Sequence, residues 1–391
     1  MTASIYPQAK ALSLNPVILH IEDDSEGYVP FSVLVPVSVS GSGAVQLGRI
    51  YDGQVYLSEA TGMAADINLA EVIDTLFIGQ VVPHTQEGIL ASRASLSRHV
   101  YFWVGTGSNT ISLDIEVYHG GVSRQLFYEL RQAGTDIFQA RFLNYNGNFF
   151  FSAVDTSWQV IRRETELMPL FFIMPEGGIT LTAHGTSQAW ESGTDYEGGL
   201  VSIDIQKLRR HFFNTYGILP SLFDVAAATD NICQIAVEQA QPSKNTVTAR
   251  YLTSLGTWEK MVLTDNPQIG YSIGNEDNND TYKVFDTVTQ DFVDSRTRRD
   301  AVNTINATTS HLLPRQRRAL LEMLQSDSVY VAVDGAPEQA ALAAIDELAW
   351  QHRQDGPERF NISFTPIRSG NIPWLYERPG IFTPQFTPPF V

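Results

Sequence analysis

The sequence predicts a mainly β protein with short helices, that is, a β-rich α+β fold. The first observation is that most of the chain up to about residue 265 consists of short segments rich in valine, isoleucine and aromatic residues, separated by glycine and asparagine turns. The second is an ordered similarity between two of these stretches, which indicates a duplication. Spacing of this kind favours two tandem β-sandwich or barrel modules.

The strands follow from the alternation of apolar and polar residues. Val29–Val39 is rich in valine, and Val100–Val104 and Ile111–Val117 are two further strands joined by a loop with two glycines. In Arg49–Leu57 the dipeptide Asp-Gly predicts a hairpin, because it supplies the two positive-φ residues of a type I′ turn. The dipeptide Asn-Gly predicts a second hairpin within Arg141–Ser152 for the same reason.

Short helices interrupt these strands. Asn68 is expected to cap a helix whose aliphatic residues share one face. Lys207–Tyr216 is a second helix, stopped by glycine and proline, and Pro314–Gln325 is a longer one, since proline is favoured at the first helical position. The segment Glu338–Trp350 is ambiguous: its alanines and its apolar spacing favour a helix, and a strand that ends in a β-bulge is the alternative. Asn361–Pro366 is expected to be a closing strand.

Two stretches of the chain share an order of elements. Ala140–Phe149 and Ala249–Trp258 both read alanine, arginine, an aromatic residue and leucine, and then glycine and a second aromatic residue. Each also follows a strand, an Asp-Ile dipeptide and a helix, so a related pair of modules is predicted. The predicted domains are a first β-rich module, a related second module, a helix-containing segment packed on the second module, and an extended arm, at 1–190, 191–300, 301–370 and 371–391.

The C-terminal arm cannot bury itself as regular secondary structure. From Pro379 onward it contains four prolines, which remove backbone donors and favour an extended chain close to polyproline II. Its phenylalanines recur at every fourth position and would form an apolar strip in water. We expect the arm to dock in a groove, on its own body or on a neighbouring subunit. The expected interface residues are Trp374, Tyr376, Phe382, Phe386 and Phe390.

Composition and charge exclude several classes of partner. The net charge is −17, and an acidic surface repels DNA and RNA, whose binding depends on cationic contacts to phosphate. The strongest apolar run, Leu167–Met174, is too short to span a bilayer and contains a proline. We therefore expect no nucleic acid partner and no membrane insertion. The single cysteine, Cys233, lies in an apolar run and is expected to be a small core residue.

No residue pattern predicts catalysis, a cofactor or a metal site. The eight histidines form no HExxH motif, and neither a phosphate-binding loop nor a nucleophile elbow follows a strand. Carboxylates cluster in Glu22–Glu26 and Glu276–Asp280, and both clusters are expected to be solvated turns; glycoside hydrolysis and calcium binding are the alternatives. Trp103, Trp158 and Trp258 lie in strand patterns and are expected in the core, although exposed aromatic residues would suit a glycan-binding platform.

The C-terminal stretch carries a resemblance to a known class of proteins. Leu312–Pro314 precedes a helix, Leu324–Val331 follows it, and Phe360–Phe364 leads to the phenylalanines of the arm. In this order the chain resembles the endings of structural proteins in the tail or baseplate of tailed bacteriophages, particularly those that infect gut Bacteroidetes. The predicted hairpins Arg141–Phe151 and Arg250–Val262 resemble the same group.

The resemblance implies a non-enzymatic structural component of a phage tail or baseplate. Such a protein acts through ring-forming subunit contacts and through a C-terminal arm that docks on a neighbour. Its partners would be further copies in a homo-oligomeric ring and other tail or baseplate proteins, and its location would be the virion tail after assembly in the host cytoplasm. The alternative is a carbohydrate-binding or glycan-cleaving protein that recognises a cell surface, so a cell-surface glycan or receptor is a further candidate partner. A third reading is a cytoplasmic scaffold unrelated to phage.

Overall fold

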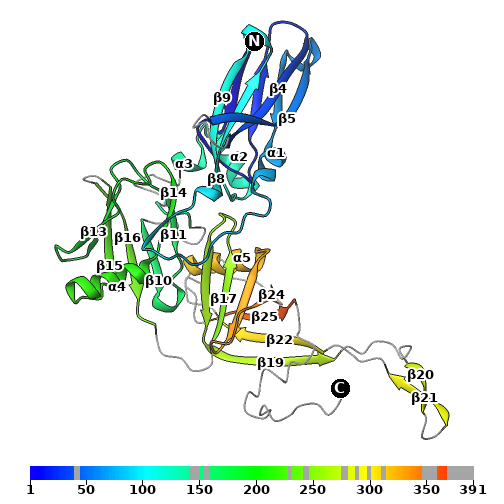
Figure 1. Ribbon diagram of the computed structural model, residues 1–391, viewed down its shortest axis with the longest axis vertical. Coiled ribbons are helices and arrows are strands. Elements are labelled where there is room, and N and C mark those ends of the chain that lie inside the picture. Colours follow the sequence, from blue (N-terminus) through cyan, green and yellow to red (C-terminus); the bar gives the residue numbers. More distant parts are fainter. Residues whose placement is uncertain are drawn as a thin grey trace. The chain divides into compact units, whose positions relative to one another are not determined.

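The computed structural model describes residues 1–38, 45–140, 149–152, 158–227, 230–240, 246–273, 281–286, 290–296, 301–309, 314–345 and 359–367. Across these ranges the fold is mainly β, with short helices and several sheets of which none closes into a barrel (Figure 1). The predicted fold class is therefore confirmed. Contacts divide the chain into two compact units, Met1–Gln241 with Leu252–Glu259, and Pro242–Tyr251 with Lys260–Val391.

The first unit contains a β-sandwich whose two sheets share one core. One sheet has the order β1–β3–β6, with bounds Thr2–Tyr6, Ile18–Glu22 and Ala64–Asn68. The other has the order β2–β9–β8–β4–β5, with bounds Lys10–Leu12, Ile111–Tyr118, Ser97–Val104, Gly27–Ser38 and Val45–Leu57. Leu19 and Ile21 of the first sheet meet Val33, Phe102 and Ile115 of the second in this core. The strands predicted at β4, β8 and β9 are confirmed within the described residues.

The hairpin predicted in Arg49–Leu57 is wrong. The strand β5 runs without a turn from Val45 to Leu57 and pairs with β4 along its length, so the Asp-Gly dipeptide lies in mid-strand. A Cβ atom at Gly53 would overlap the ring of Phe31, which is buried in the core. The glycine therefore allows a close approach to an aromatic ring and does not make a turn.

Short helices cover the first sandwich. The helix predicted after Asn68 is α1, Ala70–Asp74, continued by a 3-10 turn. Leu69 holds the N-cap position, and the backbone N–H of Ala70 donates to Oδ1 of Asn68 at 3.1 Å. Ile73 is buried in the sandwich core, as its place on the apolar face predicted. Two further helices of this region are α2, Arg124–Gln132, and α3, Ile137–Ala140. The 3-10 turn that continues α1 is Thr75–Phe77, and the others are Glu59–Thr61, Ala94–Leu96 and Gly107–Asn109.

A second core of the first unit joins two further sheets and the helix α4. The sheets have the orders β10–β16–β15–β12–β13 and β11–β14–β7. The strands of the first of these sheets are, in order, Gln159–Arg163, Asp230–Glu238, Leu222–Ala227, Ile179–Ala183 and Ala189–Glu191. The strands of the second are, in order, Leu170–Ile173, Leu200–Ile203 and Leu90–Ser92. A 3-10 turn, Glu164–Glu166, follows β10. Cys233 is buried in this core, as predicted.

The helix predicted from Lys207 is confirmed as α4, Ile205–Tyr216. It starts where Asp204 Oδ1 accepts a hydrogen bond from the backbone N–H of Lys207 at 3.0 Å. It ends at Gly217, whose φ of 71° is the left-handed conformation that glycine adopts without strain.

The second unit is built on a seven-stranded sheet with the order β18–β17–β23–β24–β25–β22–β19. In this order the strands are Trp258–Leu263, Val247–Leu252, Val329–Val333, Gln339–Ala344, Asn361–Pro366, Ala301–Thr308 and Asp265–Ile273. The predicted helix is confirmed as α5, Pro314–Gln325, and the predicted closing strand is β25. The strands β20 and β21, Thr281–Asp286 and Asp291–Arg296, form a two-stranded sheet of their own.

The helix favoured for Glu338–Trp350 is wrong where the structure describes it. Gln339–Ala344 is the strand β24, which pairs with β23 on one side and β25 on the other. Two flanking strands satisfy its backbone groups, and this non-local pairing outweighs the helix propensity of alanine.

The predicted domain ranges and the duplication stay predictions. Residue 190 lies in β13, which pairs with β12 in the same sheet of the first unit. Of the two similar stretches, one has Ala140 as the last residue of α3, and the other has Ala249 within β17. The turn of the second predicted hairpin lies outside the described residues.

Candidate functional site

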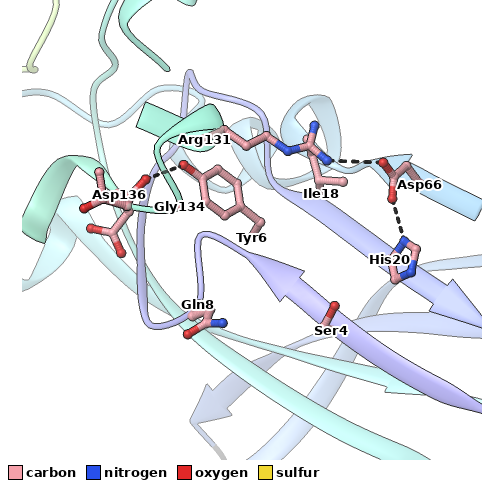
Figure 2. Close-up of a pocket in the computed structure, with 10 residues that line it drawn as sticks. Ser4, Tyr6, Gln8, Ile18, His20, Asp66, Arg131, Gly134 and Asp136 are labelled. Carbon is pink, nitrogen blue, oxygen red and sulfur yellow. Dashed lines mark hydrogen bonds and ion pairs between the residues drawn. The ribbon is translucent and has the colours of Figure 1, made fainter. Parts of the chain in front are cut away.

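A polar pocket of about 530 Å³ lies at the first sandwich (Figure 2). It is formed by the sheet β1–β3–β6 together with α2 and the loop that follows α2. The residues that line it are Ser4, Tyr6, Gln8, Ile18, His20, Asp66, Arg131, Gly134, Thr135 and Asp136.

Strand register brings three of these residues into one row. Ser4 is opposite His20 in the β1–β3 ladder, and His20 is opposite Asp66 in the β3–β6 ladder. Residues directly opposite each other on antiparallel strands share a face. His20 Nδ1 lies 2.8 Å from Asp66 Oδ1, as the dashed line in Figure 2 marks.

Arg131 reaches the same carboxylate from α2. Its Nη2 donates to Asp66 Oδ2 at 3.2 Å, and its guanidinium carbon lies 5.8 Å from the centre of the Tyr6 ring. The hydrogen bond with His20, and then that with Arg131, lowers the pKa of Asp66 below its usual value. Asp66 is therefore a firmly ionised carboxylate that holds two basic side chains in place.

Tyr6 joins the sheet to the loop after α2. Its hydroxyl donates to the carbonyl oxygen of Thr135 at 2.7 Å, and its ring meets Phe127 edge-on with 5.6 Å between the centroids. Burial, and then the charge of Asp136, raises the pKa of Tyr6. The phenol thus stays protonated and keeps its hydrogen bond at neutral pH.

The row Ser4, His20 and Asp66 has the order of a nucleophile, a base and an acid. Within the part of the chain that the structure describes, no hydrogen bond joins Ser4 to His20. Acyl transfer needs that bond and also preorganised donors for the oxyanion. What the row provides is an ionised carboxylate with two basic side chains and a serine hydroxyl beside them, which are groups that can bind a polar ligand.

The five predicted interface residues of the arm lie outside the described residues. Of the tryptophans expected in the core, Trp258 is buried and donates its indole N–H to the carbonyl oxygen of Val82 at 2.7 Å. The expectation is wrong for Trp103 and Trp158, which are 36% and 40% exposed. Trp103 lies between the buried Phe102 and Val104, so it must point to the opposite face of β8.

The sequence did not reveal the partners of the histidines. Besides His20, His99 Nε2 lies 3.1 Å from Asp114, and His184 Nδ1 lies 2.8 Å from Asp224. Each aspartate belongs to a neighbouring strand, so only the pairing of strands brings the two groups together. The alternation of polar residues on exposed faces was the one available signal, and it does not identify pairs.

Over the described ranges, His, Cys, Asp and Glu form no group of three that could hold a metal ion. The helices in those same ranges are all too short or too polar to cross a membrane. The cluster Glu22–Glu26 lies at a turn, where Asp23 binds the N-terminal amine at 3.0 Å; Glu276–Asp280 lies outside the described residues.

Comparison with protein-family models and with curated proteins finds no match for this chain.

Proposed function

We propose that the chain is a non-enzymatic structural component of a phage tail or baseplate, which forms rings through contacts between subunits. The observation that carries the proposal is the strand β5 of the first sandwich. It is 13 residues long and ends the order β2–β9–β8–β4–β5, so within the described residues only its β4 side is paired. Typical strands have about 5–6 residues.

An edge strand of this length is a template for another chain. Its free N–H and C=O groups can pair with a strand of a neighbour, which is the physical basis of strand addition between subunits. Ile50 and Tyr51 are exposed on it. A register shift next to Val33 leaves Tyr51–Leu57 as a regular stretch of this edge.

The second unit offers a further contact element. Among the described residues, the strands β20 and β21 pair with each other and with no further strand. An isolated two-stranded ribbon is marginally stable in water, so packing on a neighbour would stabilise it. The resemblance of the C-terminal stretch to tail and baseplate proteins supplies the phage assignment, the other tail proteins as partners, and the virion tail as location.

The edge is tested with lysine substitutions, because charged side chains block pairing at sheet edges. Sedimentation velocity should find a specific oligomer for the unaltered chain, and the double variant Ile50→Lys/Tyr51→Lys should weaken its association at least about tenfold. Phe213→Lys, at an exposed apolar position of α4, is the matched control and should associate normally. A chain that stays monomeric at high concentration, or a control that dissociates equally, contradicts the proposal.

The phage assignment has its own test. Mass spectrometry of purified virions of the phage that encodes the chain should find it at a copy number that fits a ring. Its absence from those virions would overturn the phage assignment. The contact at the edge of β5 would then rest on the sedimentation experiment alone.

A further inference from the structure

We infer that the solvent face of the strands β5, β4 and β8 is a binding site for a neutral glycan, that is, a polyhydroxylated ligand with apolar ring faces. This inference goes beyond the proposed structural function and concerns a face of the sheet, while the proposed subunit contact concerns its edge.

Aromatic side chains line this face in register. Tyr28 on β4 is directly opposite Tyr56 on β5, and Trp103 on β8 is directly opposite Ser32 on β4. The tyrosines are 67% and 47% exposed. Their neighbours along β4, Val29 and Phe31, are buried, so the alternation of a strand places Tyr28 and Ser32 on the outer face.

The aromatic rings form a spaced row on a rigid support. The centroids of Tyr28 and Tyr56 lie 4.8 Å apart, with 55° between the ring planes. Ser32 is four positions after Tyr28 on β4, which places Trp103 about 13 Å along the strand from the tyrosine pair. Rings that are rooted in a sheet lose little conformational entropy when a ligand stacks on them. This row is longer than a single sugar ring and therefore suits an oligosaccharide.

Polar groups accompany the rings at both ends of the row. Tyr56 donates its hydroxyl proton to Glu26 Oε1 at 2.9 Å, and Ser32 donates to Asp52 Oδ1 at 2.5 Å. Ser112 on β9 is directly opposite Trp103. Carboxylate oxygens accept hydrogen bonds from sugar hydroxyls, while aromatic faces cover the apolar faces of sugar rings. One ligand would thus use both kinds of group.

The chemistry of the face argues against other partners. Glu26 would repel phosphates, nucleic acids and anionic lipids, and Arg49, the cation beside Asp52, is engaged in an ion pair with Asp52 Oδ2 at 3.4 Å. An apolar protein surface would leave these carboxylates, Ser32 and the exposed Gln54 unpaired in the interface. A cation would gain from aromatic faces gathered around one point, whereas the tyrosine pair and Trp103 stand apart.

The test is a binding measurement with a panel of neutral oligosaccharides, namely hexamers of glucose, mannose, galactose and N-acetylglucosamine, by isothermal titration calorimetry. At least one should bind the whole chain. Trp103→Ala and Tyr28→Ala should each lower its affinity about tenfold or more, since truncated aromatic anchors dominate binding. Trp158→Ala removes an equally exposed tryptophan from outside this face and should leave the affinity unchanged.

Three results would overturn the inference. They are the absence of binding across the panel at millimolar concentration, an equal loss of affinity in Trp158→Ala, and a preference of the face for a lysine-rich peptide or for choline. Circular dichroism checks that each variant folds. Trp103→Ala should keep the oligomeric state of the unaltered chain, because Trp103 lies on β8 and not on the edge strand. A loss of glycan binding in this variant is then distinct from a loss of the subunit contact.

Discussion

Single residues hold the first unit together where charge is buried. Arg162 of β10 and Glu259, the last residue of the first unit's segment Leu252–Glu259, form a bidentate ion pair, with Nη2 2.6 Å from Oε1 and Nε 3.1 Å from Oε2. Their side chains are 7% and 6% exposed, and Ser152 accepts a further hydrogen bond from Arg162 at 3.2 Å. Such a pair stabilises little by itself, but removal of one partner leaves the other charge buried without its counter-ion.

We therefore expect Glu259→Ala to lower the free energy of unfolding by about 3–5 kcal/mol, because it removes the carboxylate that makes two hydrogen bonds to the buried Arg162 guanidinium. Urea unfolding followed by circular dichroism measures the change. Arg49→Ala breaks the exposed ion pair with Asp52 and should cost less than about 1 kcal/mol. Similar losses in the two variants would contradict the assigned role of burial.

The pocket makes a prediction about pH. Because the pKa of Asp66 lies below its ordinary value of 3.8, the ionised carboxylate stabilises the folded state above about pH 4, and this contribution is lost as the pH falls through the lowered pKa. His20→Ala should return the pKa of Asp66 toward the ordinary value. Arg131→Ala should do so to a smaller extent, since the hydrogen bond with His20 is the larger cause. Carbon-detected NMR titration of the Asp66 carboxyl measures both, and a larger effect of Arg131→Ala would reverse the assigned order.

At the scale of elements, sequence patterns predicted helix ends correctly where the stabilising interactions lie within one turn of the helix. Gly217 ends α4 and Pro314 begins α5, as predicted, because glycine and proline act within one turn of a helix; the Asp204 cap of α4 was not predicted. Local signals failed at Gly53 and in β24. In both places the decisive partner lies outside the local segment: the ring of Phe31 for Gly53, and the strand β25 for β24.

Gly53→Ala tests the role of glycine in β5. We expect a loss of about 1–3 kcal/mol in the free energy of unfolding, because the added methyl group would force the buried ring of Phe31 to move. Gly27→Ala in β4 is the control, since a Cβ atom there meets nothing within 4 Å, and it should change stability by about 0.5 kcal/mol or less. Equal effects in thermal melts of the two variants would show that the glycine has no packing role.

For the whole molecule, net charge and unpaired edges act in opposite directions. A charge of −17 would oppose association of copies at low ionic strength, while the edge of β5, which is unpaired among the described residues, would favour it. The aromatic arm would add a second attraction, since the four prolines from Pro379 onward exclude a helix and would leave the arm available for a neighbour.

Deletion of Phe382–Val391 is the test of the arm. The truncated chain should retain its circular dichroism spectrum and its unfolding transition, because the described sheets and helices lie before this segment. It should fail to assemble in sedimentation velocity runs that detect the oligomer of the full chain. Normal assembly of the truncated chain would disprove docking of the arm on a neighbour, and loss of the folded body would indicate that the arm docks on its own subunit.

The sequence by itself determined the fold class, the strands β4, β8, β9 and β25, the helices α4 and α5 and the burial of Cys233, since alternation, helical periodicity and the positions of glycine and proline are properties of a few consecutive residues. Only the tertiary structure decided which strand faces meet water and which side chains meet each other. Trp103 lies outward beside Ser32, and Ser4, His20 and Asp66 form one row across three strands. The physical reason is that strand register depends on partners distant in the chain, and a shift of one residue would exchange the two faces.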